Sequence, residues 1–255
     1  MSVQELDLSL AVRAESALAN VDLRAAERVA DLGCATGAFA ARLARLGPVV
    51  IAVDVSRENL RELERLHEPL VRTGRVQPVH AELSRLPLAD RSVDHVFCME
   101  VLEHVEDDAA ALREMARVLA PGGRLVLSVP NGAGPRPLLD RLGVRTVHDE
   151  EGPERHVRDG YTPQALRALL LEAGFEDIDL RGVGGPAFRL ATGLVGLAHL
   201  ALRRAHGQRT WTWADVERDA DSRALRLYAR LFPAFGAVAR LDGRTSLPRA
   251  STLMA

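Results

Sequence analysis

Short apolar runs alternate with amphipathic segments through the first half of the chain. The runs predict buried strands at residues 28–32, 49–53, 75–82, 93–99 and 124–129. Apolar residues at helical spacing, closed by Gly-Pro or Pro-Gly, predict helices at residues 38–46, 56–71 and 107–119. Strands that alternate with helices are typical of βαβ units, in which the strands run parallel. The pattern therefore predicts an α/β fold with a parallel sheet.

The second half of the chain is less regular. Residues 131–160 are rich in glycine, proline and charge, and predict a mobile loop. A helix is predicted at 162–173, with Thr162 as its N-cap, and a strand at 175–183. Two helical stretches, 187–205 and 214–241, precede a short last strand at 250–255. This order predicts a helical pair inserted over one face of the sheet.

Composition narrows the function classes. The 255 residues carry a formal net charge of −2, so the protein has no overall positive potential that would attract nucleic acid. Lysine is absent, which excludes a Schiff-base mechanism. The two cysteines are too few for a disulfide framework, and no Cys/His spacing suits a metal, so we expect a cytoplasmic protein without a metal site. No signal peptide is evident, and the apolar stretch 190–202 is shorter than the roughly 20 residues that span a bilayer.

The segment from Asp31 to Gly37 (DLGCATG) joins a predicted strand to a helix. Its glycines stand four residues apart, whereas a dinucleotide fingerprint needs glycine at i, i+2 and i+5, so an NAD-dependent oxidoreductase is disfavoured. Asp54 and Glu82 end the next two predicted strands, and ligands of open α/β sheets bind at that carboxyl edge. The spacing favours a nucleoside amino acid as ligand. A tight turn without a ligand, and a Glu82 that is merely exposed, remain alternatives.

These residues resemble those of class I S-adenosylmethionine-dependent methyltransferases. The segment 31–37 is similar to their motif I, and residues 86–88 with 92–96 are similar to their "LPF…FDvV" segment. Residues 99–105 (MEVLEHV) match the "evLEHv" segment of the ubiquinone-biosynthesis-like subgroup, and residues 121–125 match its "PGG.l" turn. Residues 155–158, 161–163 and 173–175 also resemble that subgroup. The departures are Ala35 for the usual central glycine and Val93 for the usual phenylalanine.

The resemblance implies a Rossmann-like, doubly wound, seven-stranded, mostly parallel sheet with a helical insertion before an antiparallel last strand. The expected parts are an N-terminal helical segment (1–27), a cofactor-binding core (28–183), the insertion (184–245) and the final strand (246–255). The implied cofactor is S-adenosylmethionine. Asp31 and the glycine loop would meet its methionine part, Asp54 its ribose and Glu82 with Leu83 its adenine, while residues 98–100 would close over the amino-acid end. The full set assigned to the cofactor is Asp31, Gly33, Cys34, Ala35, Gly37, Asp54, Val55, Glu82, Leu83, Cys98, Met99 and Glu100.

Methyl transfer to a hydroxyl needs positioning and a base, and histidine is the natural base near neutral pH. His104 follows the fourth strand and His156 lies in the long loop, so both are candidate catalytic residues. Each has a plain alternative: His104 could cap or pack its segment, and His156 could contact a neighbouring carboxylate such as Glu154. Asp94 is expected to tie a loop at the start of its strand.

We expect transfer to a small molecule, plausibly at oxygen, with a cofactor-binding protein that has lost its activity as the alternative. The region 186–241 is expected to decide the acceptor. Its leucines suit a lid over a hydrophobic acceptor, a peripheral membrane contact, or packing within a monomer or homodimer. Trp211 and Trp213 suit either packing or stacking on an aromatic acceptor.

Overall fold

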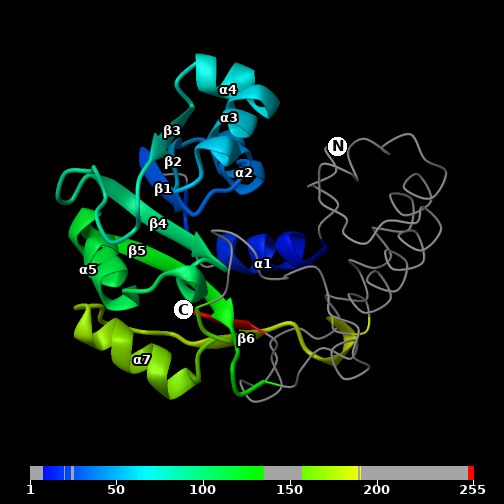
Figure 1. The fold of residues 1–255 in the computed structure, drawn as a ribbon, viewed down its shortest axis with the longest axis vertical. Coiled ribbons are helices and arrows are strands. Elements are labelled where there is room, and N and C mark those ends of the chain that lie inside the picture. The colour runs from blue at the N-terminus through cyan, green and yellow to red at the C-terminus, as the bar shows by residue number, and fades with distance from the viewer. Residues whose placement is uncertain (1–7, 20, 24–25, 135–156, 189, 191–251) are drawn as a thin grey trace. The chain divides into compact units, whose positions relative to one another are not determined.

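The computed structural model describes residues 8–19, 21–23, 26–134, 157–188, 190 and 252–255 (Figure 1). Two compact units make up the chain, one of residues 1–16, 133–155 and 181–252, the other of residues 17–132, 156–180 and 253–255. The expected domain boundaries stay a prediction. Most of the expected insertion, the loop that carries His156, and both tryptophans lie outside the described residues.

The described elements agree in order with the pattern. They are α1 (Leu8–Leu18), β1 (Arg28–Leu32), α2 (Ala38–Arg45), β2 (Val49–Asp54), α3 (Arg57–Leu66), α4 (Glu68–Arg72), β3 (Val76–His80), β4 (Val93–Met99), the 3₁₀ helix η2 (Leu102–His104), α5 (Asp108–Val118), β5 (Leu119–Pro130), α7 (Pro163–Glu172), β6 (Arg181–Val183) and β7 (Thr252–Met254).

The strands form a seven-stranded sheet in the order β3-β2-β1-β4-β5-β7-β6. The pairs β3–β2, β2–β1, β1–β4 and β4–β5 are parallel. At β7 the N–H and C=O of Ala255 both pair with those of Leu127, at 2.8 and 2.9 Å, which is the reciprocal pattern of antiparallel strands. The expected mostly parallel α/β fold with an antiparallel last strand is confirmed.

The core follows from apolar strands covered by helices. The side chains of Leu32, Ile51, Phe97 and Leu127, one from each of the four central strands, are fully buried, as parallel strands between helices require. Helices α2 and α3 pack against β2 and β3, while α5 packs against β5 and α7 (Figure 1). Because these strands run parallel, the carboxyl ends of β1, β2, β3 and β4 all lie at the same edge of the sheet.

Several predicted boundaries need correction. The helix predicted at 56–71 is two helices, because His67 leaves the helical region at φ −119°. Strand β3 ends at His80, so Glu82 lies beyond the strand rather than at its end. Ser56 and Thr162 are N-caps as predicted, since each hydroxyl accepts a backbone N–H at 3.2 Å.

The strand predicted at 175–183 is wrong over most of its length, because only Arg181–Val183 is extended and paired. Asp177 adopts φ 52°, a left-handed conformation that breaks an extended run. The carbonyl of Ile178 accepts a hydrogen bond from the Arg167 side chain at 2.9 Å. The alternation of apolar and polar residues here reflects a loop lying on the surface, not a strand.

Candidate functional site

The loop from Gly33 to Gly37 turns by repeated left-handed conformations. Gly33, Ala35 and Gly37 have φ of 74°, 46° and 83°. A Cβ on Gly33 would lie 2.3 Å from the Val101 side chain, and one on Gly37 would lie 2.5 Å from that of Leu63. Both glycines are therefore required by conformation and by packing within the protein. Ala35, where the family pattern has glycine, is exposed and tolerates its methyl group.

Asp54, the last residue of β2, holds this loop in place. One carboxylate oxygen accepts the Ala35 N–H at 2.8 Å and the other accepts the Ser56 N–H at 2.8 Å. Because a carboxylate oxygen has two acceptor positions, each can take one further donor. The carboxylate is buried, with 7% of Asp54 exposed. It can therefore serve a pair of neighbouring hydroxyls while keeping its backbone contacts.

Asp31, on the adjacent strand β1, is buried with 3% of its surface exposed. Within the described part of the chain its Oδ2 atom has no hydrogen-bond partner. Burial, together with the nearby charge of Asp54, raises the pKa of the Asp31 carboxyl to about 7. A buried acceptor without a donor is costly, and a cationic ligand group at this point would supply the missing partner.

The remaining predicted cofactor residues lie at the same edge of the sheet. Val55, directly after β2, is 52% exposed, whereas Leu83, beyond β3, is buried. Glu82 is exposed. Cys98 and Met99 end β4. Since β3, β2, β1 and β4 are neighbours and parallel, the sheet brings all of these residues to one edge.

Glu100 marks the point where the chain leaves β4. Its φ is 58°, uncommon for a residue with a side chain, and its N–H donates to the Ser128 carbonyl at 2.9 Å. The Ser128 hydroxyl lies 3.0 Å from the Glu100 carboxylate and donates to it. The bend is thus fixed to β5 by both backbone and side chain. Strained backbone of this kind concentrates at functional sites.

The two thiols are buried within this edge. Burial, with the charge of Asp31, raises the pKa of the Cys34 thiol, and burial, with the charge of Glu103, raises the pKa of the Cys98 thiol. Both cysteines therefore stay protonated, and neither is suited to act as a nucleophile. The expectation that they are small buried residues is confirmed.

His104 ends η2, beyond Glu100, and is half-buried. His156 lies outside the described residues, and its role stays a prediction. Sequence reasoning assigned no role to Glu103, Arg158 or Tyr161, although all three fall in segments that carry the family resemblance. Glu103 is buried with 1% of its surface exposed.

Asp94 has the structural role that was expected. One of its carboxylate oxygens accepts the backbone N–H groups of Glu27 and Arg28 at 2.8 and 2.9 Å. It thereby fixes the start of β1, at the opposite edge of the sheet from Asp54.

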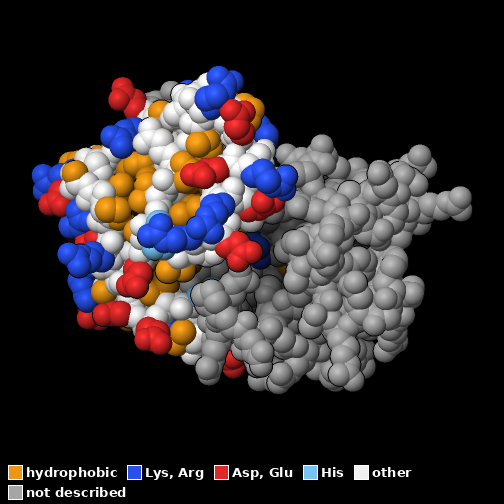
Figure 2. Space-filling model, turned by 45° about the horizontal axis from the view of Figure 1, so that its top comes forward, with side chains coloured by type: hydrophobic (Ala, Val, Ile, Leu, Met, Phe, Trp, Pro, Cys, Tyr) orange, Lys and Arg blue, Asp and Glu red, His pale blue; other side chains and the backbone are white. Residues whose placement is uncertain are grey.

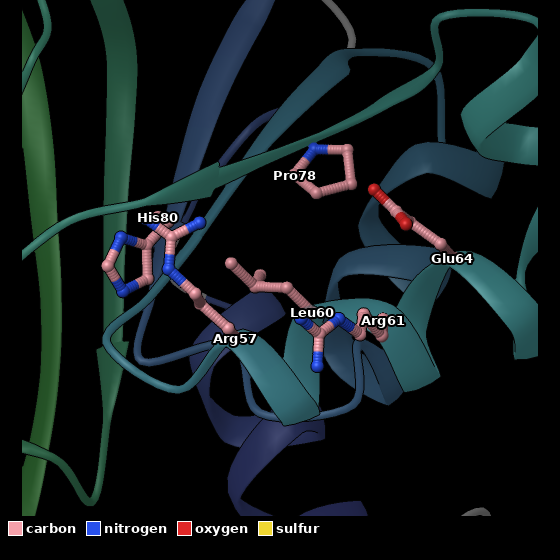
Figure 3. A pocket seen from close by; sticks show the side chains of 6 residues that line it. All are labelled: Arg57, Leu60, Arg61, Glu64, Pro78 and His80. Carbon is pink, nitrogen blue, oxygen red and sulfur yellow. The ribbon is translucent and has the colours of Figure 1, made fainter.

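A depression of about 200 Å³ lies between α3 and β3 (Figure 3). Its lining is Arg57, Leu60, Arg61, Glu64, Pro78 and His80, with the Arg57 guanidinium beside the His80 ring (Figure 3). Its lining includes none of the predicted cofactor residues, but it borders their edge of the sheet, because His80 pairs in register with Asp54 and its Nε2 lies 2.9 Å from the Val55 carbonyl. On the face in Figure 2, arginine and acidic side chains are interspersed over the described residues, in line with the balanced net charge.

Comparison with known proteins decides the family. Residues 30–127 match the model of a methyltransferase domain. A ubiquinone biosynthesis O-methyltransferase of Xanthomonas euvesicatoria pv. vesicatoria is 37% identical over 177 residues, which is 68% of this chain and 72% of that protein. The chain belongs to the S-adenosylmethionine-dependent methyltransferases. A Mycobacterium tuberculosis protein named as a probable member is 34% identical over 64% of this chain and 54% of its own length, so whole-protein activities do not transfer directly.

Solved structures show the same methyltransferase fold. The (4+2)-cyclase SpnF aligns over 100% of this chain and 82% of its own, with a TM-score of 0.61 and 20% identity. A methyltransferase fold therefore does not by itself fix the reaction, which has to be argued from the site. Among the described residues of this methyltransferase, no helix is long and apolar enough to cross a membrane.

Proposed function

We propose that this methyltransferase moves a methyl group from S-adenosylmethionine to a hydroxyl of a small, hydrophobic or aromatic molecule. The observation that carries the choice of methyl donor is the buried Asp31 Oδ2, which has no donor among the described residues, near the Asp54 carboxylate at the end of the next strand. A cofactor with an α-ammonium group and a ribose diol supplies donors of the kind that these two carboxylates accept.

Each predicted cofactor residue has a part in this assignment. Asp31 accepts from the α-ammonium, the backbone of Gly33, Cys34, Ala35 and Gly37 surrounds the methionine part, and Asp54 accepts from the ribose. Val55, Glu82 and Leu83 border the adenine, and the end of β4 (Cys98, Met99) with Glu100 closes over the amino-acid end. The exposed Val55 side chain supports this, because it offers an apolar surface for a base.

Bound S-adenosylmethionine supplies a methyl group already activated as a sulfonium, so the protein has to position the acceptor and remove a proton. The chain's own part would be to hold the acceptor hydroxyl in line with the methyl group and to take the hydroxyl proton on a histidine imidazole as the methyl group is transferred. His156 is our first candidate for that base and His104 the second. Transfer to oxygen is supported by the name of the Xanthomonas relative.

The test is a screen with labelled methyl donor. Purified full-length chain is incubated with phenols, catechols, aliphatic alcohols, amines and carboxylic acids, and the labelled product is identified. Label on a phenol or alcohol oxygen supports the proposal, whereas label on nitrogen or carbon alone contradicts it. Binding of S-adenosylhomocysteine without transfer to any acceptor supports the alternative of a cofactor-binding protein that has lost its activity. Cytoplasmic location, peripheral membrane contact and a monomeric or homodimeric state stay predictions.

A further inference from the structure

The side chain of Arg158 binds carbonyls that lie 52 to 56 residues earlier in the sequence. Its Nη1 donates to the carbonyls of Leu102 and Val105 at 2.9 and 2.7 Å, and its Nη2 donates to the carbonyl of Glu106 at 3.1 Å. One guanidinium thus satisfies three carbonyls of residues 102–106, here called the 102–106 turn. The side chain is 25% exposed, so water competes little for these bonds.

The residues around Arg158 strengthen the same junction. The N–H groups of Val157 and Arg158 both donate to the Glu103 carbonyl, at 3.0 and 3.3 Å. The Tyr161 hydroxyl accepts from Arg158 at 2.9 Å and donates to the Asp108 carboxylate at 2.8 Å, and that carboxylate lies 3.3 Å from the guanidinium. Residues 157–161, here called the 157–161 segment, are therefore fastened to the turn by backbone and side chains together.

The 102–106 turn is anchored by the buried side chains of Leu102 and Glu103, while its own backbone forms only a short helix. It follows the left-handed Glu100 and forms a 3₁₀ helix of three residues. Inside it, the His104 N–H donates to the Val101 carbonyl at 2.9 Å and the Val105 N–H donates to the Leu102 carbonyl at 3.2 Å. Short 3₁₀ helices have poor hydrogen-bond geometry, so contacts from outside decide where such a turn lies.

We propose that Arg158 is a positioning residue for methyl transfer: by locking the 102–106 turn to the 157–161 segment, it fixes His104, the second candidate base of the proposed function. The inference rests on the proposed function, because the placement of His104 affects turnover only if a methyl acceptor binds there. If Arg158 served fold stability alone, its loss would lower the free energy of unfolding without lowering kcat of the folded protein.

The chain offers a matched control. Arg117 also holds a loop, since it donates to the carbonyls of Leu86 and Leu88 at 3.1 and 2.8 Å and pairs with Asp90 and Glu114 at 2.7 Å. That loop leads to the amino end of β4, away from the predicted cofactor edge. Arg158→Lys and Arg117→Lys each keep the charge but lose the planar fork that reaches several carbonyls at once.

The first readout is amide hydrogen exchange of the full-length chain. In Arg158→Lys we expect the amides of His104 and Val105 to exchange about 10- to 100-fold faster, because charge-assisted bonds to the turn are lost. The Leu127 amide in β5 should change less than about threefold. In Arg117→Lys the exchange rates of the His104 and Val105 amides, relative to that of the Leu127 amide, should be the same as in the wild type. An equal acceleration of the turn and of Leu127 in Arg158→Lys overturns the proposal.

The second readout separates catalysis from cofactor binding. With the acceptor found in the labelled-methyl screen, kcat of Arg158→Lys should fall about tenfold or more, while affinity for S-adenosylhomocysteine falls by no more than it does in His104→Ala. Arg117→Lys should keep its kcat. An unchanged kcat in Arg158→Lys overturns the proposal. A wild-type chain that transfers no methyl group overturns the proposed function instead, and the exchange ratio at His104 still decides whether Arg158 places the turn.

Discussion

At the predicted cofactor end the backbone carries the geometry: residues 33–37 turn through left-handed conformations, and Asp54 holds them by accepting the Ala35 N–H, 19 residues away in sequence. At the proposed acceptor end, the 102–106 turn is held by side chains and backbone from more than fifty residues along the chain. The first region consists of one strand–turn–helix unit and its neighbouring strand. The second region forms only when segments far apart in the sequence come together in the fold. Such a region suits the part of the site that varies from one methyl acceptor to another.

The largest effect is expected at the acceptor end. His156→Ala should lower kcat by roughly 10²–10⁴ with a hydroxyl acceptor while affinity for S-adenosylhomocysteine stays nearly unchanged, because only proton removal is lost. His104→Ala should lower both kcat and affinity for S-adenosylhomocysteine, because His104 follows the bend at Glu100, a predicted cofactor residue. The measurements are labelled-methyl turnover and calorimetry, with His95→Gln, near the amino end of β4, as control. Turnover that survives loss of both His104 and His156 would show that the acceptor needs no base.

Gly33→Ala should destabilise the loop at the predicted cofactor end, because the added methyl group would clash with a neighbouring side chain. The new Cβ would meet Val101 at 2.3 Å and would sit at φ 74°. A left-handed alanine costs about 1–2 kcal/mol and overpacking about 1–3 kcal/mol more, so the free energy of unfolding should fall by their sum. Gly74→Ala is the matched control, because Gly74 has φ 71° and open space around it. Equal losses in urea denaturation of the two variants would contradict the packing argument.

Asp31→Asn should raise the free energy of unfolding of the cofactor-free protein while lowering its affinity for the cofactor. The folded pKa of about 7 exceeds the ordinary 3.8, so the ionised carboxyl favours the unfolded state, and stability is lost as pH rises from about 4 to 7. At pH 8 the variant should gain a few kcal/mol, seen as a thermal midpoint several degrees higher. At pH 5 the gain should be smaller. A midpoint difference that is the same at pH 5 and pH 8 would contradict this account.

The same carboxyl should make cofactor binding depend on pH. An α-ammonium needs Asp31 ionised, so affinity for S-adenosylhomocysteine should be about tenfold lower at pH 6 than at pH 8 in the wild type. In Asp31→Asn the affinity should be lower throughout and nearly independent of pH. Calorimetry at the two pH values checks both, and an unaltered pH dependence in the variant would place the titrating group elsewhere.

The smallest effect is expected at Ala35. Its methyl group is exposed and its φ is 46°, so Ala35→Gly relieves local strain while adding freedom to the unfolded chain. The two effects oppose each other, and the free energy of unfolding should change by less than about 1 kcal/mol. Affinity for S-adenosylhomocysteine should change by less than about threefold. A larger loss of affinity would show that the alanine methyl contacts the cofactor.

The sequence predicts the cofactor end well because its signals are local. Strand β1 has the predicted bounds, since an apolar run stops at Gly33, and Asp54 falls at the end of β2 because a second apolar run stops there. The pattern does not predict that Asp54 accepts a hydrogen bond from the Ala35 N–H. Nor does it predict that the Leu63 side chain leaves no room for a Cβ at Gly37. These are contacts between elements, which periodicity does not encode.

The acceptor end shows the limit of such reasoning. Arg158 reads as an exposed arginine in a charged loop, and its bonds to the 102–106 turn depend on how β4 and β5 pair. The alternation at 175–183 predicted a strand that a left-handed Asp177 prevents. Local pattern is therefore enough to predict the candidate cofactor residues, whereas the proposed positioning role of Arg158 needed the folded chain.

The most direct test compares two carboxylates that do the same structural work at opposite edges of the sheet. Asp54 and Asp94 each accept two backbone N–H groups, but only Asp54 lies at the predicted cofactor edge. By calorimetry with S-adenosylhomocysteine, Asp54→Ala should bind about 10- to 100-fold more weakly, because the ribose hydroxyls lose a charged acceptor. Asp94→Ala should bind within about twofold of the wild type. A folded Asp54→Ala chain with wild-type affinity, or an equal loss in both variants, would contradict the account.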